Sequence, residues 1–192
     1  KRIMQAMKMI ATVKYAKTQV MISSFRPYFD AYSKIIKTVS KMSTKNGEKY
    51  LKPRESKNDL LILISSDRGL WGSYNSNLFR NIERDENEFG AKLFIGKKGK
   101  DYFKDDNFID RDISFTEKDF LEVSKEISPI ILEKFLNQEV DNVYIGYNKF
   151  ISAISQDPSI VRVLPFDLED DDNDSVSKYW QLLYHLPFPS KR

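Results

Sequence analysis

The amino-acid sequence predicts an α/β fold, in which a long N-terminal helix precedes a domain with a mainly parallel sheet flanked by helices. The first observation behind this prediction is the segment 1–24, which lacks glycine and proline and is rich in helix formers. The second is the alternation of apolar runs with amphipathic segments from residue 60 onward. Strands that alternate with helices along a chain form a mainly parallel sheet. We therefore predict a helix over 1–44, a linker over 45–59 and a globular domain over 60–192.

The N-terminal helix carries an apolar stripe at three- and four-residue spacing. The stripe consists of Ile3, Met7, Ile10, Val13, Val20 and Met21, and continues through Phe25, Phe29, Tyr32, Ile36 and Val39. Pro27 interrupts it, which predicts a kink or a displaced stripe. At ~1.5 Å per residue the helix would be roughly 60 Å long, more than the diameter of the domain that follows. Packing on its own domain can cover only part of such a stripe, so the sequence favours a partner helix or an enclosing protein.

The linker and the first half of the globular domain follow from local signals. Asn46-Gly47 and Pro53 break any helix in the linker. The run "LLILISS" is typical of a strand buried on both faces. The segment "SYNSNLFRNIERDENEF" predicts a helix capped by Ser73 or Asn75, followed by a strand at "AKLFIG" and a short helix at "KKGKDYFKDD".

The second half of the domain is predicted to contain one longer helix and further strands. The helix begins at Thr116, and Pro129 can kink it. A strand follows at "VDNVYIGYNKF", and "FISAIS" with "SIVRVLPF" forms a strand pair that turns at Asp157-Pro158. The charge run "DLEDDDND" is typical of a solvated loop, "KYWQLLYH" can form a last strand, and "LPFPSKR" predicts no structure.

Composition excludes several kinds of site. The chain has 31 basic and 28 acidic residues and a net charge of +3, a balance that does not argue for nucleic acid. It has no cysteine, which excludes disulfides, thiolate chemistry and cysteine-ligated metals. It has one histidine, His185, so a histidine metal cluster is excluded as well. No apolar run approaches the length of a membrane span, and these features favour a soluble, intracellular protein.

The stretch "ISSDRGLWGSYNSN", residues 64–77, has the layout of a strand running into a helix through a turn with two glycines, an arrangement that often binds phosphate. The spacing of Gly69 and Gly72 matches neither GxGxxG nor the phosphate loop GxxxxGK[ST], and Trp71 would crowd a pyrophosphate. Asp67 lacks a paired acid, base or nucleophile, so a role in capping the turn is the simpler explanation. A strand-to-helix turn at the carboxyl end of the sheet is the simpler interpretation, and such turns also make good contact surfaces because they project from a rigid edge.

The other candidate sites are also weak. In "IGKKGKDYF" no serine or threonine follows Lys100 to hold magnesium, so a basic helix start is the simpler interpretation. A lone histidine such as His185 is more often structural than catalytic. We predict no catalytic residues, no metal site and no cofactor.

Four segments between residues 5 and 166 resemble the gamma subunit of the F-type ATP synthase. "QAMKMIATVKYAKTQ" followed by "SFRPYFDAYSKII" is similar to the first long helix of that family, K-A-M-K-M-V-A-x-x-K-x-x-x-x-Q and then x-R-P-Y. "SSDRGLWGSYNSN" resembles its turn S-S/T-D-R-G-L-C-G-x-x-N, and "IGKKGKDYF" and "YNKFISAISQDPSIVRVLPF" match in order and spacing. Gln5, Trp71 and Ser73 depart from the lysine, cysteine and glycine that are usual there; Trp71 removes any thiol chemistry and can alter the fit to a neighbour.

The resemblance implies a Rossmann-like domain and a coiled coil. In the family the first helix pairs antiparallel with a long C-terminal helix, which is absent from this sequence, and further residues precede the counterpart of Lys1. The implied function is that of a non-catalytic rotor, which couples ion flow to ATP synthesis or hydrolysis by turning inside a ring of alpha and beta subunits. The implied partners are that ring, the epsilon (or delta-equivalent) subunit and the membrane ring of c subunits. The implied location is the cytoplasmic face of the bacterial inner membrane, or its mitochondrial or plastid equivalent.

The resemblance also implies two contact regions for the alpha–beta ring. The helix residues expected to face it are Met7, Lys8, Met9, Ile10, Ala11 and Lys14, and the turn residues are Asp67, Arg68, Gly69, Leu70, Trp71 and Gly72. Two alternatives remain open: a free-standing nucleotide-binding or hydrolytic enzyme, which would need a phosphate loop or a paired acid and base, and a rotor-like subunit of a specialised ATPase that is not coupled to ion translocation.

Overall fold

The computed structural model describes residues 4–13, 15–17, 19–20, 24, 27, 31, 50–51, 54, 58–69, 72–104, 109, 113, 120–152 and 155–166. Most of the predicted linker, the helix start at Thr116, the charge run and the last strand at "KYWQLLYH" lie outside these residues. Lys14, Leu70 and Trp71 lie outside them as well, and so does His185.

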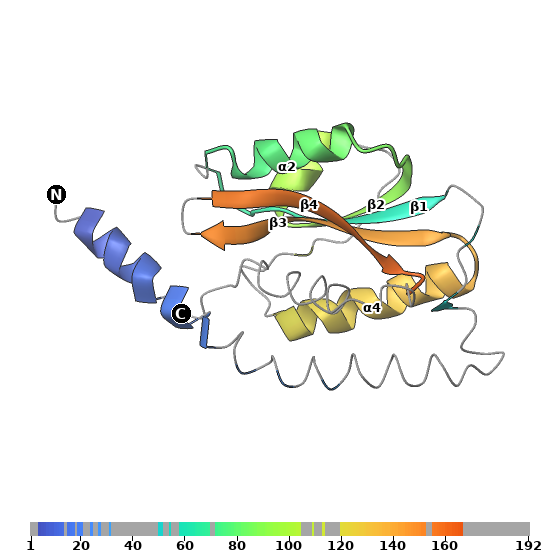
Figure 1. Cartoon of the computed structure of the whole chain (residues 1–192), viewed down its shortest axis with the longest axis horizontal. Helices are drawn as coiled ribbons and strands as arrows, with labels where there is room; N and C mark the ends of the chain where they lie inside the picture. The colour runs from blue at the N-terminus through green and yellow to red at the C-terminus, as the bar shows by residue number, and fades with distance from the viewer. Residues whose placement is uncertain are drawn as a thin grey trace.

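The described domain is a four-stranded sheet with helices on both faces (Figure 1). Its strands are β1 (Asp59–Ile64), β2 (Phe89–Ile95), β3 (Asn142–Ser152) and β4 (Ser155–Leu164), in the order β2-β1-β3-β4. β1 pairs in parallel with both β2 and β3, whereas β3 and β4 are antiparallel. The helices are α2 (Tyr74–Glu83), α3 (Lys97–Phe103) and α4 (Phe120–Leu136). The predicted mixed α/β fold with a mainly parallel sheet is confirmed.

The core is divided between the two faces of β1. Every residue of this strand is buried, as its unbroken apolar run predicts. Because successive side chains of a strand point to opposite faces, Leu61 and Leu63 pack with Leu78 and Phe79 of α2. On the opposite face, Leu60, Ile62 and Ile64 join the larger cluster that contains residues of α4. Figure 1 shows α2 and α4 on opposite sides of the sheet.

The predicted turn at Asp157-Pro158 is wrong. The segment "FISAIS" continues β3 as far as Ser152, and β4 begins at Ser155, so the hairpin turns between them. Pro158 lies inside β4 and pairs with Asn148. A proline is tolerated here because β4 is an edge strand of the described sheet, where one side of the strand has no ladder that needs its missing N–H.

The helix starts differ in part from the prediction. Ser73 occupies the N-cap position of α2, but its side chain makes no capping hydrogen bond. Asn75, the alternative cap, lies inside α2, and its side chain bonds Ser66 of the preceding turn instead. In α4, Pro129 is exposed and the helix runs through it without a break.

The N-terminal segment is helical wherever the structure describes it between residues 4 and 31, and each of these residues is exposed. Figure 1 shows residues 4–13 as a helix that extends away from the domain. The ring of Tyr15 approaches the ring of Phe150 in β3, with 5.9 Å between their centroids. The helix length of 44 residues and its pairing in a coiled coil stay predictions, because 32–49 lie outside the described residues.

A buried tyrosine makes the domain sensitive to alkaline pH. Burial, followed by the charge of Asp157, raises the pKa of Tyr147 from 10.0 to about 12. Between these values the unfolded chain binds fewer protons than the folded chain, so stability falls as the pH rises. We expect the contribution of the neutral phenol to be complete below pH 10 and to be lost progressively between pH 10 and about 12.

Urea unfolding of the chain and of a Tyr147→Phe variant, compared from about pH 9 to about pH 11.5, measures this contribution. The free energy of unfolding should fall more steeply with pH in the unmodified chain. Equal slopes in the two proteins would show that Tyr147 does not titrate as described.

Candidate functional site

The candidate site is the turn that follows β1, at the carboxyl end of the parallel strands. Its first residue, Ser65, still pairs with β2, because its N–H donates to the carbonyl of Ile95 over 2.8 Å. The hydroxyl of Ser65 is buried, lies 3.3 Å and 3.1 Å from the carbonyl oxygens of Ile95 and Gly96, and accepts a 2.8 Å hydrogen bond from the Gly99 N–H. The turn therefore begins from a point that is fixed to β2 and α3.

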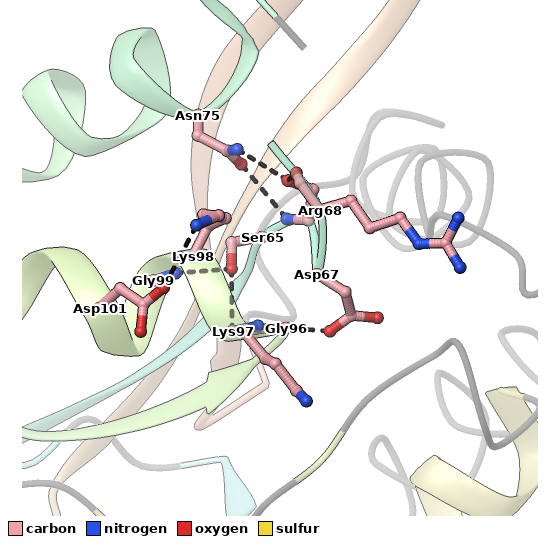
Figure 2. A network of polar contacts seen from close by, with 10 residues as sticks. Ser65, Asp67, Arg68, Asn75, Gly96, Lys97, Lys98, Gly99 and Asp101 are labelled. Carbon is pink, nitrogen blue, oxygen red and sulfur yellow. Dashed lines mark hydrogen bonds and ion pairs between the residues drawn. The ribbon is translucent and has the colours of Figure 1, made fainter. Parts of the chain in front are cut away.

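The next residue, Ser66, is bound to α2. Its N–H donates to Oδ1 of Asn75 over 3.2 Å, and Nδ2 of Asn75 donates to its hydroxyl over 2.7 Å. The hydroxyl in turn donates to the carbonyl of Arg68 over 2.7 Å. Beside Asn75, burial raises the pKa of Tyr74, whose carbonyl accepts a hydrogen bond from Asn148. Figure 2 shows this network between the turn and its neighbouring helices.

The carboxylate of Asp67 caps the start of α3. Its Oδ1 accepts a 3.3 Å hydrogen bond from the N–H of Lys97, the first residue of that helix. One residue later, the N–H of Lys98 donates to the carbonyl of Ser66 over 3.0 Å. Asp67 therefore contacts an element that lies 30 residues further along the chain. Its predicted role in capping its own turn stays a prediction.

A cavity of about 390 Å³ lies beside the turn. It is lined by Asp67, Phe94, Gly96, Lys97, Lys98, Lys100, Asp101 and Ile113. The ammonium group of Lys98 pairs with the carboxylate of Asp101 at 3.3 Å, and both side chains are largely exposed. An exposed pair of this kind contributes little to stability.

Backbone N–H groups at the start of the turn and at the start of α3 are engaged within the protein. A phosphate loop needs backbone N–H groups that point at the ligand. The N–H groups of Ser65 and Ser66 at the start of the turn, and those of Gly96, Lys97, Lys98 and Gly99 beside it, are instead donated within the chain. Their acceptors are protein oxygens, so a phosphate that used these N–H groups would have to break the network that holds the turn.

The structure brings part of the predicted turn site together. Asp67 is half-buried, whereas Arg68, Gly69 and Gly72 are exposed. The side chain of Arg68 extends away from the polar network (Figure 2). Sequence reasoning missed Asn75 as part of this site; an asparagine near a helix start is a common cap, so its sequence position suggested a different role.

The predicted helix site is separate from the turn in the chain and is exposed. Met7, Lys8, Met9, Ile10 and Ala11 are helical, with 65% of Met7, 71% of Met9 and 57% of Ile10 accessible to solvent. Among the residues that the structure describes, no group of histidine, aspartate and glutamate side chains is arranged to hold a metal ion. Within the same residues, no helix combines the length and the apolar character needed to cross a bilayer.

The mixed α/β domain with its helical N-terminal extension matches a known family of proteins. The family model described as ATP synthase matches residues 1–186. The chain is 31% identical over 188 residues to an ATP synthase gamma chain of Brevibacillus brevis, covering 93% of this chain and 65% of the relative. It is 33% identical over 193 aligned positions to a gamma chain of Glaesserella parasuis, covering 95% of this chain and 66% of the relative. The chain therefore belongs to the ATP synthase gamma chain family.

Two further comparisons bear on the breadth of the family and on the fold. A gamma chain of Acetobacterium woodii, described as sodium ion specific, is 30% identical over 88% of this chain and 57% of its own length. A chain of the Tetrahymena thermophila mitochondrial ATP synthase central stalk and c-ring has the same fold, with a TM-score of 0.62 and 22% identity over 94% of this chain and 86% of that chain. The chain spans about two-thirds of the length of the first two relatives, 65% and 66%.

Proposed function

We propose that this chain is the non-catalytic rotor of an F-type ATP synthase, coupling ion flow through a membrane sector to ATP synthesis or hydrolysis in an alpha–beta ring. The observation that carries the proposal is the uncovered N-terminal helix. Met4, Met9 and Val20 are 75%, 71% and 72% exposed. Apolar side chains gathered on one exposed helix mark a surface that another protein covers, and membership of the gamma chain family supports an ATP synthase complex as that partner.

The physical basis of the proposed coupling is differential binding. A rotor that is asymmetric about its axis contacts each beta subunit differently at each angle. An orientation that binds one beta conformation better than another shifts the population of that subunit, by an amount set by the difference in affinity. Turning the rotor then changes nucleotide affinity from site to site, and no reacting group on the rotor is needed.

The helix residues suit a contact that has to slide. Met7 and Met9 are flexible and can repack against changing neighbours, and Ala11 is small. Lys8 is exposed and can attract acidic residues of the ring without fixing one geometry. Lys14 belongs to the same proposed contact by its position in the motif.

The turn suits a contact with protein. The side chain of Arg68 is exposed, so the turn offers a guanidinium to a partner. An arginine can form paired hydrogen bonds with a carboxylate. We assign Asp67, Arg68, Gly69, Leu70, Trp71 and Gly72 to the ring contact, with Asp67 acting through the capping bond to α3.

The remaining partners follow from the same proposal. The globular domain joins the epsilon (or delta-equivalent) subunit and the c-subunit ring, and thereby transmits torque from ion flow. The complex lies on the cytoplasmic face of a bacterial inner membrane or its organellar equivalent. Purifying the full-length subunit with alpha and beta subunits of its own organism, followed by imaging, tests this assignment. A subunit that does not co-purify with the alpha–beta hexamer, or a helix lying outside the ring, would contradict it.

Reversing the charge of Lys8 or Arg68 should uncouple the proposed complex. We expect Lys8→Glu and Arg68→Glu each to lower ATP synthesis by about tenfold, because an attraction to acidic residues becomes a repulsion at the same place. Nucleotide binding by the ring should be unchanged, since the ring carries those sites. ATP synthesis in reconstituted vesicles and nucleotide titration of the complex measure the two quantities.

Lys125→Glu is the matched control for these variants. It makes the same charge change at an exposed lysine of α4, away from both proposed contacts. Its rate of ATP synthesis should stay close to that of the unmodified complex. If all three variants lose activity equally, net charge and not a local contact is responsible.

A further inference from the structure

The turn after β1 is bound to two helices. Asn75 of α2 binds both the N–H and the hydroxyl of Ser66, at 3.2 Å and 2.7 Å. The first residues of α3 bind the carbonyl of Ser66 and the carboxylate of Asp67, at 3.0 Å and 3.3 Å. Figure 2 shows Asn75 above the turn, Lys97 below it and Lys98 to the left.

The same network reaches the backbone of Arg68. The hydroxyl of Ser66 accepts from Asn75 and donates to the carbonyl of Arg68 over 2.7 Å. The backbone of Arg68 is therefore fixed by a chain of two hydrogen bonds that begins at Asn75, while its side chain extends away from them. A group held in place before binding loses less conformational entropy when its partner arrives.

We infer that Asn75 is a positioning residue, which holds the backbone of Arg68 so that its guanidinium meets the partner surface in one orientation. This inference rests on the proposed rotor function. Asn75 is half-buried in α2, and the structure assigns its side-chain hydrogen bonds to Ser66. It acts through Ser66 and not by touching the partner.

The chemistry of asparagine explains why this residue type is required. Its amide oxygen accepts from the Ser66 N–H while its amide nitrogen donates to the Ser66 hydroxyl. Alanine would supply neither group and would leave the N–H of the buried Ser66 without this acceptor. Aspartate would keep the acceptor but could not donate to the hydroxyl. The Ser66 hydroxyl would then turn its only hydrogen toward the carboxylate and away from the Arg68 carbonyl.

Asn81 offers a matched control on the same helix. It is also a half-buried asparagine of α2, and its Nδ2 donates to the carbonyl of Pro158 in β4 over 3.4 Å. An alanine at this position removes a side-chain hydrogen bond between α2 and the sheet without touching the turn. The effects of Asn81→Ala therefore measure what the loss of any such side-chain hydrogen bond of α2 does to the subunit.

The test uses full-length rotor in the complete complex, with Asn75→Ala, Asn75→Asp, Arg68→Ala and Asn81→Ala, and the double variant of Asn75→Ala with Arg68→Ala. We expect Asn75→Ala to lower ATP synthesis by about three- to tenfold, as for the loss of one hydrogen bond in a contact. The rate of ATP synthesis with Asn75→Asp should lie between the rate with Asn75→Ala and that of the unmodified complex. Asn81→Ala should leave the rate of ATP synthesis unchanged. It should lower the thermal stability of the subunit about as much as Asn75→Ala does.

The double variant separates positioning from a merely structural role. If Asn75 acts by placing Arg68, then Asn75→Ala should cost little once Arg68→Ala has removed the guanidinium, and the two effects should not add. The inference would be overturned if the effects of Asn75→Ala and Arg68→Ala on the rate of ATP synthesis were additive. It would also be overturned if Asn75→Ala and Asn81→Ala lost the same amount of ATP synthesis. If Asn75→Ala does not fold, the same cycle with Asn75→Asp decides. Failure of the unmodified subunit to support synthesis would instead overturn the proposed function.

Discussion

Phe135→Ala is expected to lower the free energy of unfolding by about 3–5 kcal/mol, the usual cost of removing a fully buried aromatic ring. Phe135 is 0% exposed and belongs to the core cluster between α4 and the sheet. Its ring stacks on Tyr50 with 6.3 Å between centroids. Arg54 lies 4.2 Å from the ring centroid, and its guanidinium donates to the carbonyls of Phe135 and Val140. The variant therefore opens a cavity and removes the surface on which this arginine rests.

Urea denaturation followed by circular dichroism measures the change. Leu132→Ala is the matched control, because Leu132 lies on the same helix but is 39% exposed. Alanine is a strong helix former, so this control should cost less than about 1 kcal/mol. Similar losses in both variants would mean that α4 does not pack on the sheet through Phe135.

The elements best predicted from sequence are those whose signal is local. The apolar run of β1 predicted a strand buried on both faces, and β1 is buried throughout. The alternation of strands and helices predicted the parallel pairing of β1 with its two neighbours. In these elements the burial of side chains, the spacing of apolar residues and the secondary-structure propensity all favour the same structure. A short window of sequence is therefore enough to predict them.

The hairpin shows where a local signal failed. Asp157-Pro158 has the composition of a turn, yet both residues lie within β4. Whether a proline ends a strand depends on whether its N–H would have a partner, and that depends on the position of the strand in the sheet. The edge position of β4 is set by pairing over the whole domain, so the tolerance for Pro158 could not be read from its neighbours.

The candidate turn shows a different limit. The motif around Gly69 and Gly72 located the turn, and the missing phosphate-loop pattern argued against a nucleotide. The contacts that hold the turn join residues far apart in the chain: Asp67 bonds Lys97, and Ser65 bonds Gly99. Short polar side chains form such bonds only where the fold brings them together. Their types were visible in the sequence, but their partners were not.

Gly96→Ala is expected to lower the free energy of unfolding by about 3 kcal/mol or more, because two costs coincide at this residue. Gly96 has φ +91° and ψ +140°, a backbone conformation that side chains strongly disfavour. A Cβ atom there would also collide with the carbonyl oxygen of Ser65 and lie 2.8 Å from its carbonyl carbon. These are backbone atoms of the turn, so a rotamer change cannot relieve the contact. Displacing Ser65 would also strain its hydrogen bonds to β2 and α3.

Gly69→Ala provides the control, because an added Cβ there meets no atom within 4 Å and the backbone is outside the positive-φ region. A glycine replaced at a compatible position usually changes stability by less than about 1 kcal/mol, often favourably, since the unfolded chain loses freedom. The two variants make the same glycine-to-alanine change at different positions, so their thermal unfolding can be compared directly. Gly96→Ala should unfold at a clearly lower temperature. Equal stability of the two variants would mean that α3 does not approach Ser65 as closely as the turn requires. The conclusion that the turn is attached to α3 would then be wrong.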